Sequence, residues 1–434
     1  MSTQAYGLFG HPLGHSISPQ IHTSLFHLTA CDGSYRLLDT PEDQIHAAFE
    51  QSRETLCGYN CTIPYKQTII PLLDTISGEA RDMGAVNTVA VREGKLHGYN
   101  TDILGFLTCL ATDGISLAGK HVLVLGSGGT SRMMLYAAKT GGAASVTVAA
   151  RRVEAARELH DQVMALSDVH GGFDLIFNGT SAGMWPKIEG TALRADQMAG
   201  CEYLFDAVYN PPVTQLMREA QAAGARVRGG LLMLVSQAAA AQEIWRGMRF
   251  TREQLLSTER DAAFRLACQR LHQARERENL VLIGFMATGK STLGRQLAAA
   301  MDMEFLDTDA LIEERAGMAI PEIFAQFGET KFRELEREVA ESLCEKKNTV
   351  ISTGGGMPLA CGEVLRRAGF VVFLNPPEEF IARNAGSGEG RPLFRENWQA
   401  RLHDRMPAYR ACANAELTAV GSAAQRARMV AELV

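Results

Sequence analysis

Two stretches of the chain combine a short apolar run, a glycine-rich turn and a segment of helical periodicity. The first starts at His121 and reads HVLVLGSGGTSRMMLYAAKT, and the second starts at Asn279 and reads NLVLIGFMATGKSTLGRQLAAAM. A run of leucine and β-branched residues predicts a strand buried in a parallel sheet. A glycine-rich turn before a helix leaves N–H groups that can bind phosphate. The pattern therefore predicts an α/β fold with two nucleotide-binding units.

The composition is that of a multi-domain globular protein. A length of 434 residues predicts about three compact units, and an apolar content of 46% excludes a mainly disordered chain. The net charge of −6 gives no basic footprint for nucleic acid. Nine cysteines without a CxxC pair fit a reducing compartment. The sequence shows neither a signal peptide nor a membrane-spanning run, so we expect a cytoplasmic enzyme that binds neither nucleic acid nor membrane.

A charged stretch marks the boundary between the two nucleotide-binding parts. Residues 273–278 read QARERE and contain no large apolar side chain, which predicts a solvated helix end or a linker. A second boundary is expected near Asp113, before the first glycine-rich unit. The part that precedes this second boundary is long enough for a domain of its own.

The first glycine-rich turn has the features of a dinucleotide site. Glycines allow the backbone to approach a pyrophosphate, and Ser131 is a small residue at the third glycine position of GxGxxG. The next predicted strand ends in Arg151 and Arg152 rather than in an acidic residue. Guanidinium groups pair with a 2′-phosphate, which favours NADP(H) over NAD, although a solvated helix start is the alternative interpretation. The predicted cofactor-binding residues are Gly126, Ser127, Gly128, Gly129, Arg151 and Arg152.

Polar residues in the first part of the chain fall at turns that follow apolar positions. Ser16 and Ser18 are two residues apart, so their hydroxyls face the same way on an extended segment, although Ser18 before Pro19 also reads as a helix N-cap. The segments NCTIPYK (60–66), GAVNT (84–88) and YNTD (99–102) supply Asn60, Thr62, Lys66, Asn87, Thr101 and Asp102. This set suits a small polyhydroxylated ligand, and a lysine near a carboxylate can serve as a proton donor.

Together with NGTSAGM (178–184), FDAVYNPPVTQL (205–216) and GGLLMLVSQAA (229–239), these segments resemble shikimate dehydrogenase over about residues 5–270. The resemblance implies NADPH-dependent reduction of 3-dehydroshikimate, with Lys66 and Asp102 as the catalytic pair. It also implies that Ser16, Ser18, Thr62, Asn87 and Gln237 contact the substrate. The sequence departs from the family pattern at Thr130, where alanine is usual, and at Ala150-Arg151-Arg152, where Asn-Arg-Thr is usual.

The second glycine-rich turn matches the phosphate-binding pattern GxxxxGK[ST] from Gly284 to Ser291. In this pattern the lysine, Lys290, neutralises the β- and γ-phosphates and the serine reaches magnesium. Asp307 and Asp309 follow the next predicted strand and could instead be helix N-caps. Arg333 and Glu336 are three residues apart on a helix, where an ordinary ion pair is the alternative. Three glycines occur in STGGGMP (352–358), and GEGRPLF (388–394) has the composition of a mobile lid.

This ordered set resembles shikimate kinase over about residues 279–434. The resemblance implies that Asp309 acts as the base and that Arg391 closes over the transferring phosphoryl group. It further implies a shikimate site formed by Asp309, Arg333, Gly355, Gly356 and Arg405, a metal site at Ser291 and Asp307, and a nucleotide site at Gly284, Thr288, Gly289, Lys290, Ser291, Thr292 and Arg383. Ala287 stands where the family usually has glycine.

The sequence thus predicts a bifunctional enzyme of consecutive steps that uses NADP(H), ATP and Mg²⁺. The predicted α/β domains are a substrate domain (1–112, completed by 237–272), a Rossmann NADP domain (113–236), a linker (273–278) and a P-loop kinase domain with a parallel sheet (279–434). Two alternatives stay open at this point. The first half could oxidise quinate with NAD, or one half could be a shikimate-binding sensor without turnover. The oligomeric state is open.

Overall fold

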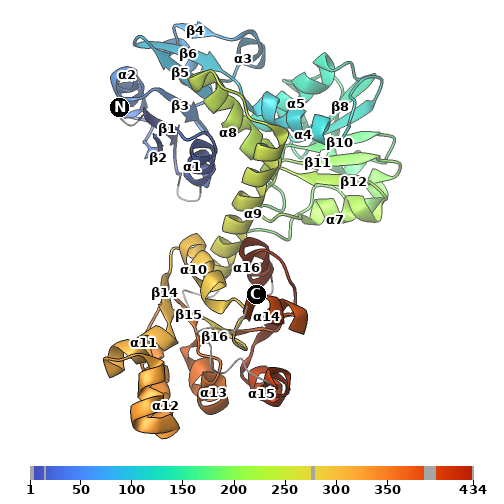
Figure 1. Cartoon of the computed structure of the whole chain (residues 1–434). Helices are drawn as coiled ribbons and strands as arrows, with labels where there is room; N and C mark the ends of the chain where they lie inside the picture. The colour runs from blue at the N-terminus through green and yellow to red at the C-terminus, as the bar shows by residue number, and fades with distance from the viewer. Residues whose placement is uncertain (1–3, 14–15, 275–278, 386–396, 433–434) are drawn as a thin grey trace. The chain divides into compact units, whose positions relative to one another are not determined.

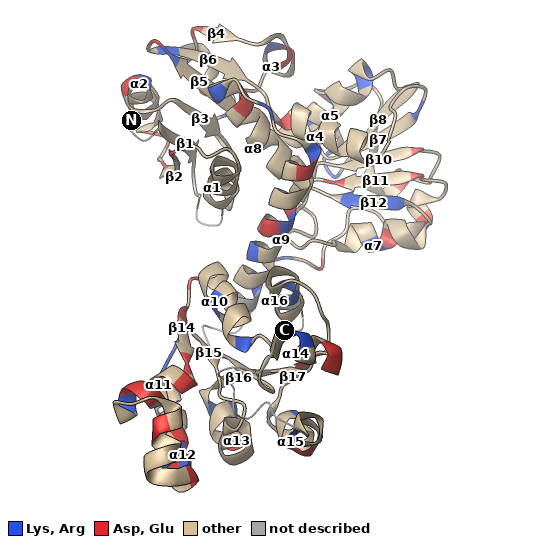
Figure 2. Cartoon of the chain, in the orientation of Figure 1, with Lys and Arg blue, Asp and Glu red and all other residues tan. Residues whose placement is uncertain are grey.

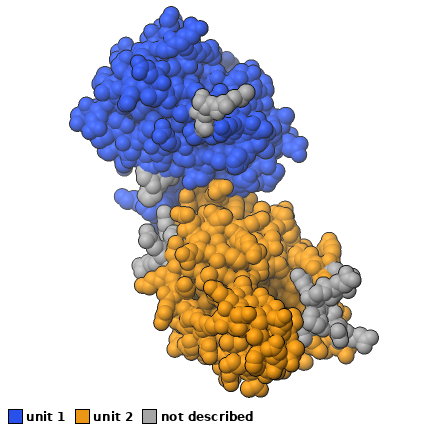
Figure 3. Space-filling model, turned by 60° about the vertical axis from the view of Figure 1, so that its left-hand side comes forward, with its two compact units in different colours: residues 1–263 blue, residues 264–434 orange. Residues whose placement is uncertain are grey.

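The chain forms α/β units built on three sheets (Figure 1), in agreement with the predicted fold class. The computed structural model describes residues 4–13, 16–274, 279–385 and 397–432. By the density of internal contacts the chain divides into two compact units, residues 1–263 and 264–434 (Figure 3). Unit 1 contains two of the sheets, and unit 2 contains the third.

The first sheet of unit 1 is mixed and has the strand order β2-β1-β3-β5-β6-β4. β1 pairs parallel with β2 and β3, whereas β5 runs antiparallel to both β3 and β6. Phe9 packs edge to face against Phe49 and Tyr59 in its core. The elements in chain order are β1 (Gln4–Gly10), α1 (Ser18–Leu28), β2 (Gly33–Asp39), α2 (Ile45–Thr55), β3 (Gly58–Cys61), β4 (Thr75–Ile76), α3 (Gly78–Met83), β5 (Thr88–Arg92), β6 (Lys95–Tyr99) and α4 (Asp102–Thr112).

The second sheet of unit 1 is parallel and has the order β12-β11-β10-β7-β8-β9. The chain enters this sheet at the central strand β7, adds β8 and β9 on one side, and then adds β10, β11 and β12 on the other side. The strand order therefore reverses beside β7. Ligands of doubly wound sheets bind at such a switch point. The elements are β7 (His121–Leu125), α5 (Gly129–Thr140), β8 (Ser145–Ala150), α6 (Val153–Arg157), β9 (Val163–Ala165), β10 (Leu175–Asn178), β11 (Tyr203–Asp206), α7 (Gln215–Ala222) and β12 (Arg226–Gly229).

Two helices follow the second sheet. α8 (Leu231–Arg246) packs against α4, α1 and β5, which belong to the part of unit 1 built on the first sheet. Its Trp245 Nε1 donates a hydrogen bond of 2.9 Å to the carbonyl of Val89. α9 (Arg252–Ala274) contains the point of division at residues 263 and 264. In its second part, Phe264 and the fully buried Cys268 pack with Leu293 and other core residues of unit 2.

The division between the units therefore differs from the boundary that the charged stretch predicts. The structure assigns residues 264–274 to the second unit, whereas the sequence analysis places the division at 273–278. Residues 275–278 lie outside the described residues. The difference has a physical reason: the apolar contacts of this helix precede the charged stretch, so charge alone marks the end of the helix and not the end of a core.

Unit 2 has a parallel sheet of order β14-β15-β13-β16-β17, again with its first strand at the centre. β13 is fully buried on both faces, as its NLVLI sequence predicts. The elements are β13 (Asn279–Ile283), α10 (Lys290–Met301), β14 (Glu304–Asp307), α11 (Thr308–Ala316), α12 (Ile320–Leu343), β15 (Thr349–Ser352), α13 (Met357–Ala368), β16 (Gly369–Leu374), α14 (Glu378–Ala385), α15 (Trp398–Cys412), β17 (Ala415–Leu417) and α16 (Ala423–Glu432).

Charge is unevenly distributed over unit 2. Acidic residues are concentrated on α11 and α12, as Figure 2 shows. Arg333 of α12 forms ion pairs with Glu329 and Glu336. Within the described part of the chain, no helix has both the length and the apolar character that a membrane crossing needs.

Candidate active sites

In the first sheet, polar residues meet where β3 ends, β5 begins and β6 ends. The antiparallel register places Asn60 opposite Thr88, and Thr88 opposite Tyr99. Asn87 precedes β5, and the first residue of α4, Asp102, follows β6 after a short turn. Residues that are separated in the sequence are thus brought to one edge of the sheet.

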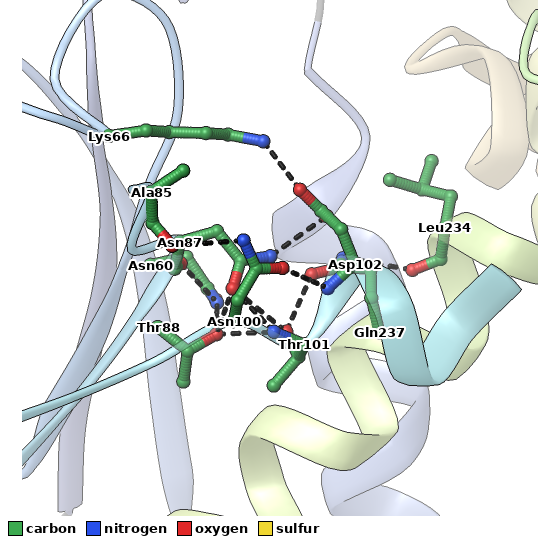
Figure 4. A network of polar contacts seen from close by, with 10 residues as sticks. All are labelled: Asn60, Lys66, Ala85, Asn87, Thr88, Asn100, Thr101, Asp102, Leu234 and Gln237. Carbon is green, nitrogen blue, oxygen red and sulfur yellow. Dashed lines mark hydrogen bonds and ion pairs between the residues drawn. The ribbon is translucent and has the colours of Figure 1, made fainter. Parts of the chain in front are cut away.

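Lys66 and Asp102 form an ion pair at this edge (Figure 4). Lys66 Nζ lies 2.6 Å from Asp102 Oδ2, and both side chains are partly exposed. The other oxygen, Oδ1, accepts a hydrogen bond of 2.8 Å from the side-chain amide of Asn87. Asp102 therefore holds the ammonium group of Lys66 in a place that a small ligand can reach, and Asn87 fixes the carboxylate.

A buried layer of hydrogen bonds orients Asn87. Its Oδ1 accepts from the backbone N–H of Thr101 at 2.7 Å and from the hydroxyl of Thr88 at 3.0 Å. Asn60 donates to the Asn87 carbonyl and to Thr88, and it accepts from Tyr35 at 2.8 Å. Asn60 is almost fully buried and Thr101 is fully buried. Their hydrogen bonds therefore hold Asn87 and Thr88 in place beneath the exposed part of the site. Their role as substrate contacts stays a prediction.

The remaining predicted substrate residues lie on other elements. Gln237, on α8, accepts a hydrogen bond of 3.5 Å from Thr101, which ties α8 to the network of Figure 4. Ser16 and Ser18 are joined through their hydroxyls at 3.1 Å. The N-cap of α1 is Ile17 and not Ser18, although proline does occupy the first turn as expected. The N-cap interpretation of Ser18 is therefore wrong, because the helix already includes that residue. Thr62 follows β3 and is half-buried.

The turn after β7 fits a pyrophosphate. A β-carbon at Gly128 or Gly129 would meet nothing within 4 Å, so the space beside both residues is open. The helix α5 begins there without a side-chain cap, which leaves N–H groups for a ligand. Ser131 is buried, and its hydroxyl donates to the Leu125 carbonyl at 3.0 Å. A serine is thus accommodated at the third glycine position because it bonds back to the preceding strand.

Arg151 and Arg152 lie beside this turn. Leu125 at the end of β7 pairs with Ala149 of β8, and the two arginines follow β8 directly. Both are exposed, and neither has an ion pair within the described residues. Two guanidinium groups at this place have the chemistry that a 2′-phosphate requires. The residues present therefore fit NADP(H).

In unit 2 the loop after β13 has the form of a phosphate-binding loop. Lys290 is buried, and its Nζ donates to the carbonyls of Gly284 at 2.9 Å and Phe285 at 2.8 Å. Gly289 adopts φ 84° just before α10, a conformation that favours glycine. Ala287 adopts φ 62°. This left-handed conformation costs a residue with a β-carbon about 1–2 kcal/mol, which explains why glycine is usual at this position.

Ser291 and Asp307 form the place for a metal ion. Ser291 Oγ donates to Asp307 Oδ2 at 2.7 Å and lies 3.2 Å from Ser352 Oγ. Oxygen ligands from a hydroxyl and a carboxylate beside phosphates are the donors that Mg²⁺ prefers, so these residues fit Mg²⁺. Asp307 is also the N-cap of α11 and accepts from the backbone N–H of Asp309. The alternative that Asp309 is itself an N-cap is therefore wrong.

The carboxyl of Asp309 has a pKa that is shifted toward neutral pH. Loss of water around the carboxyl and the negative charge of Asp307 raise its pKa, Lys290 lowers it, and the net value is about 6, although the residue keeps an exposed surface. Gly354 lies against it, and a β-carbon at that residue would stand 2.4 Å from Asp309 Oδ1. A carboxyl group with a pKa close to the working pH is suited to accept a proton.

Two arginines lie against the other glycines of the same loop. Arg333 pairs with Glu336 at 2.5 Å, and a β-carbon at Gly356 would stand 2.6 Å from Arg333 Nη1. Arg405 donates to the Gly355 carbonyl at 3.2 Å. Gly354 and Gly356 thus make room for Asp309 and Arg333, and the carbonyl of Gly355 accepts the hydrogen bond of Arg405.

Some of these features escaped the sequence analysis. Gly354, which contacts Asp309, belongs to the glycine run but is not among the predicted site residues. Tyr409 donates from its hydroxyl to the Gly355 carbonyl at 2.7 Å, and its place one helical turn after Arg405 could have indicated this. Glu336 reads as an ordinary ion-pair partner, yet it is buried, and burial cannot be read from a helix pattern.

The other predicted nucleotide residues are distributed around the loop. Thr288 is buried and donates to the Phe285 carbonyl at 2.8 Å, whereas Thr292 is exposed on α10. Arg383 is exposed on α14. Arg391 lies outside the described residues, as does the rest of the predicted lid.

The two units define an oxidoreductase with a dinucleotide turn, joined to a P-loop kinase. The profile of the shikimate dehydrogenase substrate binding domain matches residues 8–89, and the shikimate kinase profile matches residues 286–434. The chain is 37% identical over 256 residues to shikimate dehydrogenase (NADP(+)) of Geobacillus kaustophilus, with 56% of this chain and 93% of that protein covered.

Solved structures agree with this likeness. The shikimate 5-dehydrogenase of Thermus thermophilus, in complex with NADP(H) and shikimate, is 34% identical, with a TM-score of 0.56 over 60% of this chain and 99% of that chain. A chorismate mutase/shikimate 5-dehydrogenase fusion protein of Clostridium acetobutylicum is 32% identical, with a TM-score of 0.59 over 60% of this chain and 98% of that chain. The chain belongs to the shikimate dehydrogenase family and carries a shikimate kinase domain at its C-terminal side. Both domains are those of the shikimate pathway of aromatic biosynthesis.

Proposed function

We propose that this chain reduces 3-dehydroshikimate to shikimate with NADPH and then phosphorylates shikimate at its 3-hydroxyl with ATP and Mg²⁺. The observation that carries the proposal is the Lys66–Asp102 ion pair in a chain that also holds Asp309, Arg333 and Arg405 around a glycine loop. The first site would form the molecule that the second site is built to bind.

In the reduction, Lys66 is the proton donor. When bound, NADPH supplies a hydride to the ring carbonyl carbon, and the carbonyl oxygen gains negative charge. The ammonium group of Lys66 stabilises that charge and delivers a proton, which completes the hydroxyl group. Asp102 holds Lys66 and accepts a hydrogen bond from a substrate hydroxyl, while Asn87 keeps the carboxylate in place.

In the phosphorylation, Asp309 is the base. It accepts the proton of the 3-hydroxyl as that oxygen attacks the γ-phosphorus of ATP, and ADP leaves. Arg333 and Arg405 pair with the carboxylate of shikimate, a role for which guanidinium groups are suited. Lys290 neutralises the phosphates, and Ser291 and Asp307 would hold the magnesium ion.

Arg151 and Arg152 support NADP(H) over NAD, which argues against the quinate alternative. Their exposure beside the dinucleotide turn leaves both guanidinium groups available to a 2′-phosphate. The sensor alternative is disfavoured because the chain retains Lys66, Asp102, Lys290 and Asp309. A protein that only bound shikimate would need neither a proton donor, nor a base, nor a lysine that neutralises phosphates.

The proposal is tested by two assays on the purified chain. The first follows NADPH oxidation with 3-dehydroshikimate, and the second follows ADP formation with shikimate. We expect turnover in both, with far weaker oxidation of quinate by NAD. Turnover in only one assay would support a sensor, and oxidation of quinate with NAD that is faster than reduction of 3-dehydroshikimate with NADPH would support the quinate alternative.

A further inference from the structure

Arg426, on α16, lies directly against the phosphate-binding loop. Its Nη1 donates a hydrogen bond of 2.7 Å to the carbonyl of Thr288, the residue before Gly289. The same Nη1 is the atom that a β-carbon at Gly289 would approach, at 3.0 Å. Gly289 in turn precedes Lys290 at the start of α10. A guanidinium group thus stands one peptide unit from the backbone that cradles phosphate in such loops.

The charge of Arg426 is buried and has no anionic partner within the described residues. The residue is 3% exposed, and its Nε and Nη2 have no hydrogen-bond partner there. The guanidinium carbon also lies 5.0 Å from the centroid of the Phe380 ring. Burial also lowers the pKa of this group from its ordinary value. A buried cation without a counter-ion is unfavourable, so its place beside a phosphate site requires an explanation.

No motif in the sequence identifies this residue. The phosphate-binding pattern gives Lys290 as the cation of the loop. The resemblance to shikimate kinase implies Arg383 at the nucleotide site and Arg391 over the transferring phosphoryl group. Arg426 lies far along the chain in an ordinary helical segment, AAQRARMV. The structure alone brings it to the loop.

We propose that Arg426 is a second resident cation of the nucleotide site, which strengthens binding of the ATP and ADP phosphates through the protein interior. Its unpartnered N–H groups are covered by protein, so it acts by its charge and by holding Thr288, not by direct contact. Charges interact more strongly across a buried, low-dielectric region than across water. The negative charge of a bound nucleotide then compensates the burial of Arg426. This inference rests on the proposed kinase function of the same loop.

The proposal predicts opposite effects on stability and on nucleotide affinity. Arg426→Met keeps most of the apolar stem and removes the charge. Without nucleotide, the variant should unfold at the same temperature as the parent chain or at a higher one, because a buried unpaired charge has gone. The Kd for MgADP and the KM for ATP should rise about tenfold, while the KM for shikimate stays unchanged. Arg426→Lys keeps a cation and should retain most of the affinity.

The matched control is Arg428→Met. It removes the same charge from the same helix, but Arg428 is exposed, so solvent screens it and the affinity for MgADP should hardly change. NADPH-dependent reduction by the same full-length chains reports whether the rest of the molecule is intact. Calorimetric titration with MgADP and thermal unfolding without nucleotide measure the two effects.

The outcomes separate this inference from the proposed function. Unchanged MgADP affinity in Arg426→Met, or an equal loss in Arg428→Met, contradicts the role of Arg426. A variant that unfolds at a lower temperature and keeps its affinity identifies Arg426 as a purely structural contact. If Arg426→Met does not fold, the comparison of Arg426→Lys with Arg426→Gln decides, since only the first keeps the charge. Failure of the parent chain to bind MgADP would instead contradict the kinase function itself.

Discussion

Asp309 occupies the space that a side chain at residue 354 would fill. A β-carbon at Gly354 would lie 2.4 Å from Asp309 Oδ1, and the Gly354 N–H donates to the adjacent Thr308 hydroxyl at 2.8 Å. The glycine loop and the start of α11 are thus in close contact. This contact takes water away from the Asp309 carboxyl, and that desolvation is the main cause of its raised pKa, although the residue keeps an exposed surface.

The raised pKa predicts a pH dependence for phosphorylation. The Asp309 carboxyl has a pKa of about 6, and it can accept a proton only when ionised. The kcat/KM for shikimate should therefore be high above pH 7 and fall with decreasing pH, reaching half of its maximum near pH 6, because kcat/KM reports the free enzyme. Asp309→Asn should lose about 10²–10⁴ in rate. A profile that stays flat down to pH 5 would contradict the assignment of Asp309 as the base.

Lys66→Ala should abolish reduction and leave phosphorylation intact. Loss of a positioned acid costs about 10²–10⁴ in rate, and Lys66 is the cation that the structure places on Asp102. Reduction of 3-dehydroshikimate and phosphorylation of added shikimate are measured on the same preparation. Lys290→Ala is the matched control and should show the reverse pattern. Near-normal reduction by Lys66→Ala would remove Lys66 from the mechanism.

Arg151 and Arg152 should determine the preference for NADPH. Replacement of either by alanine removes a guanidinium group that we expect to pair with the 2′-phosphate, and this should cost about 1.5–3 kcal/mol in NADPH affinity. NADH lacks that phosphate, so its affinity should remain the same. Titration of each variant with both cofactors measures the difference. Equal losses for both cofactors would show that the arginines act on the fold instead.

The kinase unit should need residues 264–274 for full stability. Phe264 and Cys268 belong to its core, so a fragment of residues 277–434 leaves a gap that a fragment of residues 264–434 does not. The shorter fragment should be less stable by about 2–4 kcal/mol, which lowers its Tm on the order of 5–10 °C. Thermal unfolding of the two fragments checks this. Equal Tm values would show that the kinase core ends at the charged stretch, as the sequence alone predicts.

Much of the fold could be predicted because it depends on local patterns. The apolar runs around Val122 and Val281 predict buried parallel strands, and the glycine-rich turns that follow them predict phosphate-binding sites. The position of the division within helix α9 could not be predicted from the sequence. It depends on which face of the helix is buried in its first part and which in its second part. The composition of the segment marks only the charged end of that helix.

The candidate sites show the same division. Lys66 and Asp102 are found by motif, since each follows a recognisable turn. The supporting contacts of Asn60 and Tyr35, and the burial of Arg426, depend on pairing between distant segments, and no short motif records them. Motifs identified the residues that we expect to touch ligands, and the structure was needed to find the residues that support them.

The central claim is that one chain carries out both steps in succession. The most direct test incubates the purified chain with 3-dehydroshikimate, NADPH, ATP and Mg²⁺ and follows shikimate 3-phosphate by mass spectrometry. Shikimate 3-phosphate should form in proportion to NADPH oxidised, and omission of ATP should leave shikimate as the product. Oxidation of NADPH without shikimate 3-phosphate, or no oxidation at all, would contradict the account.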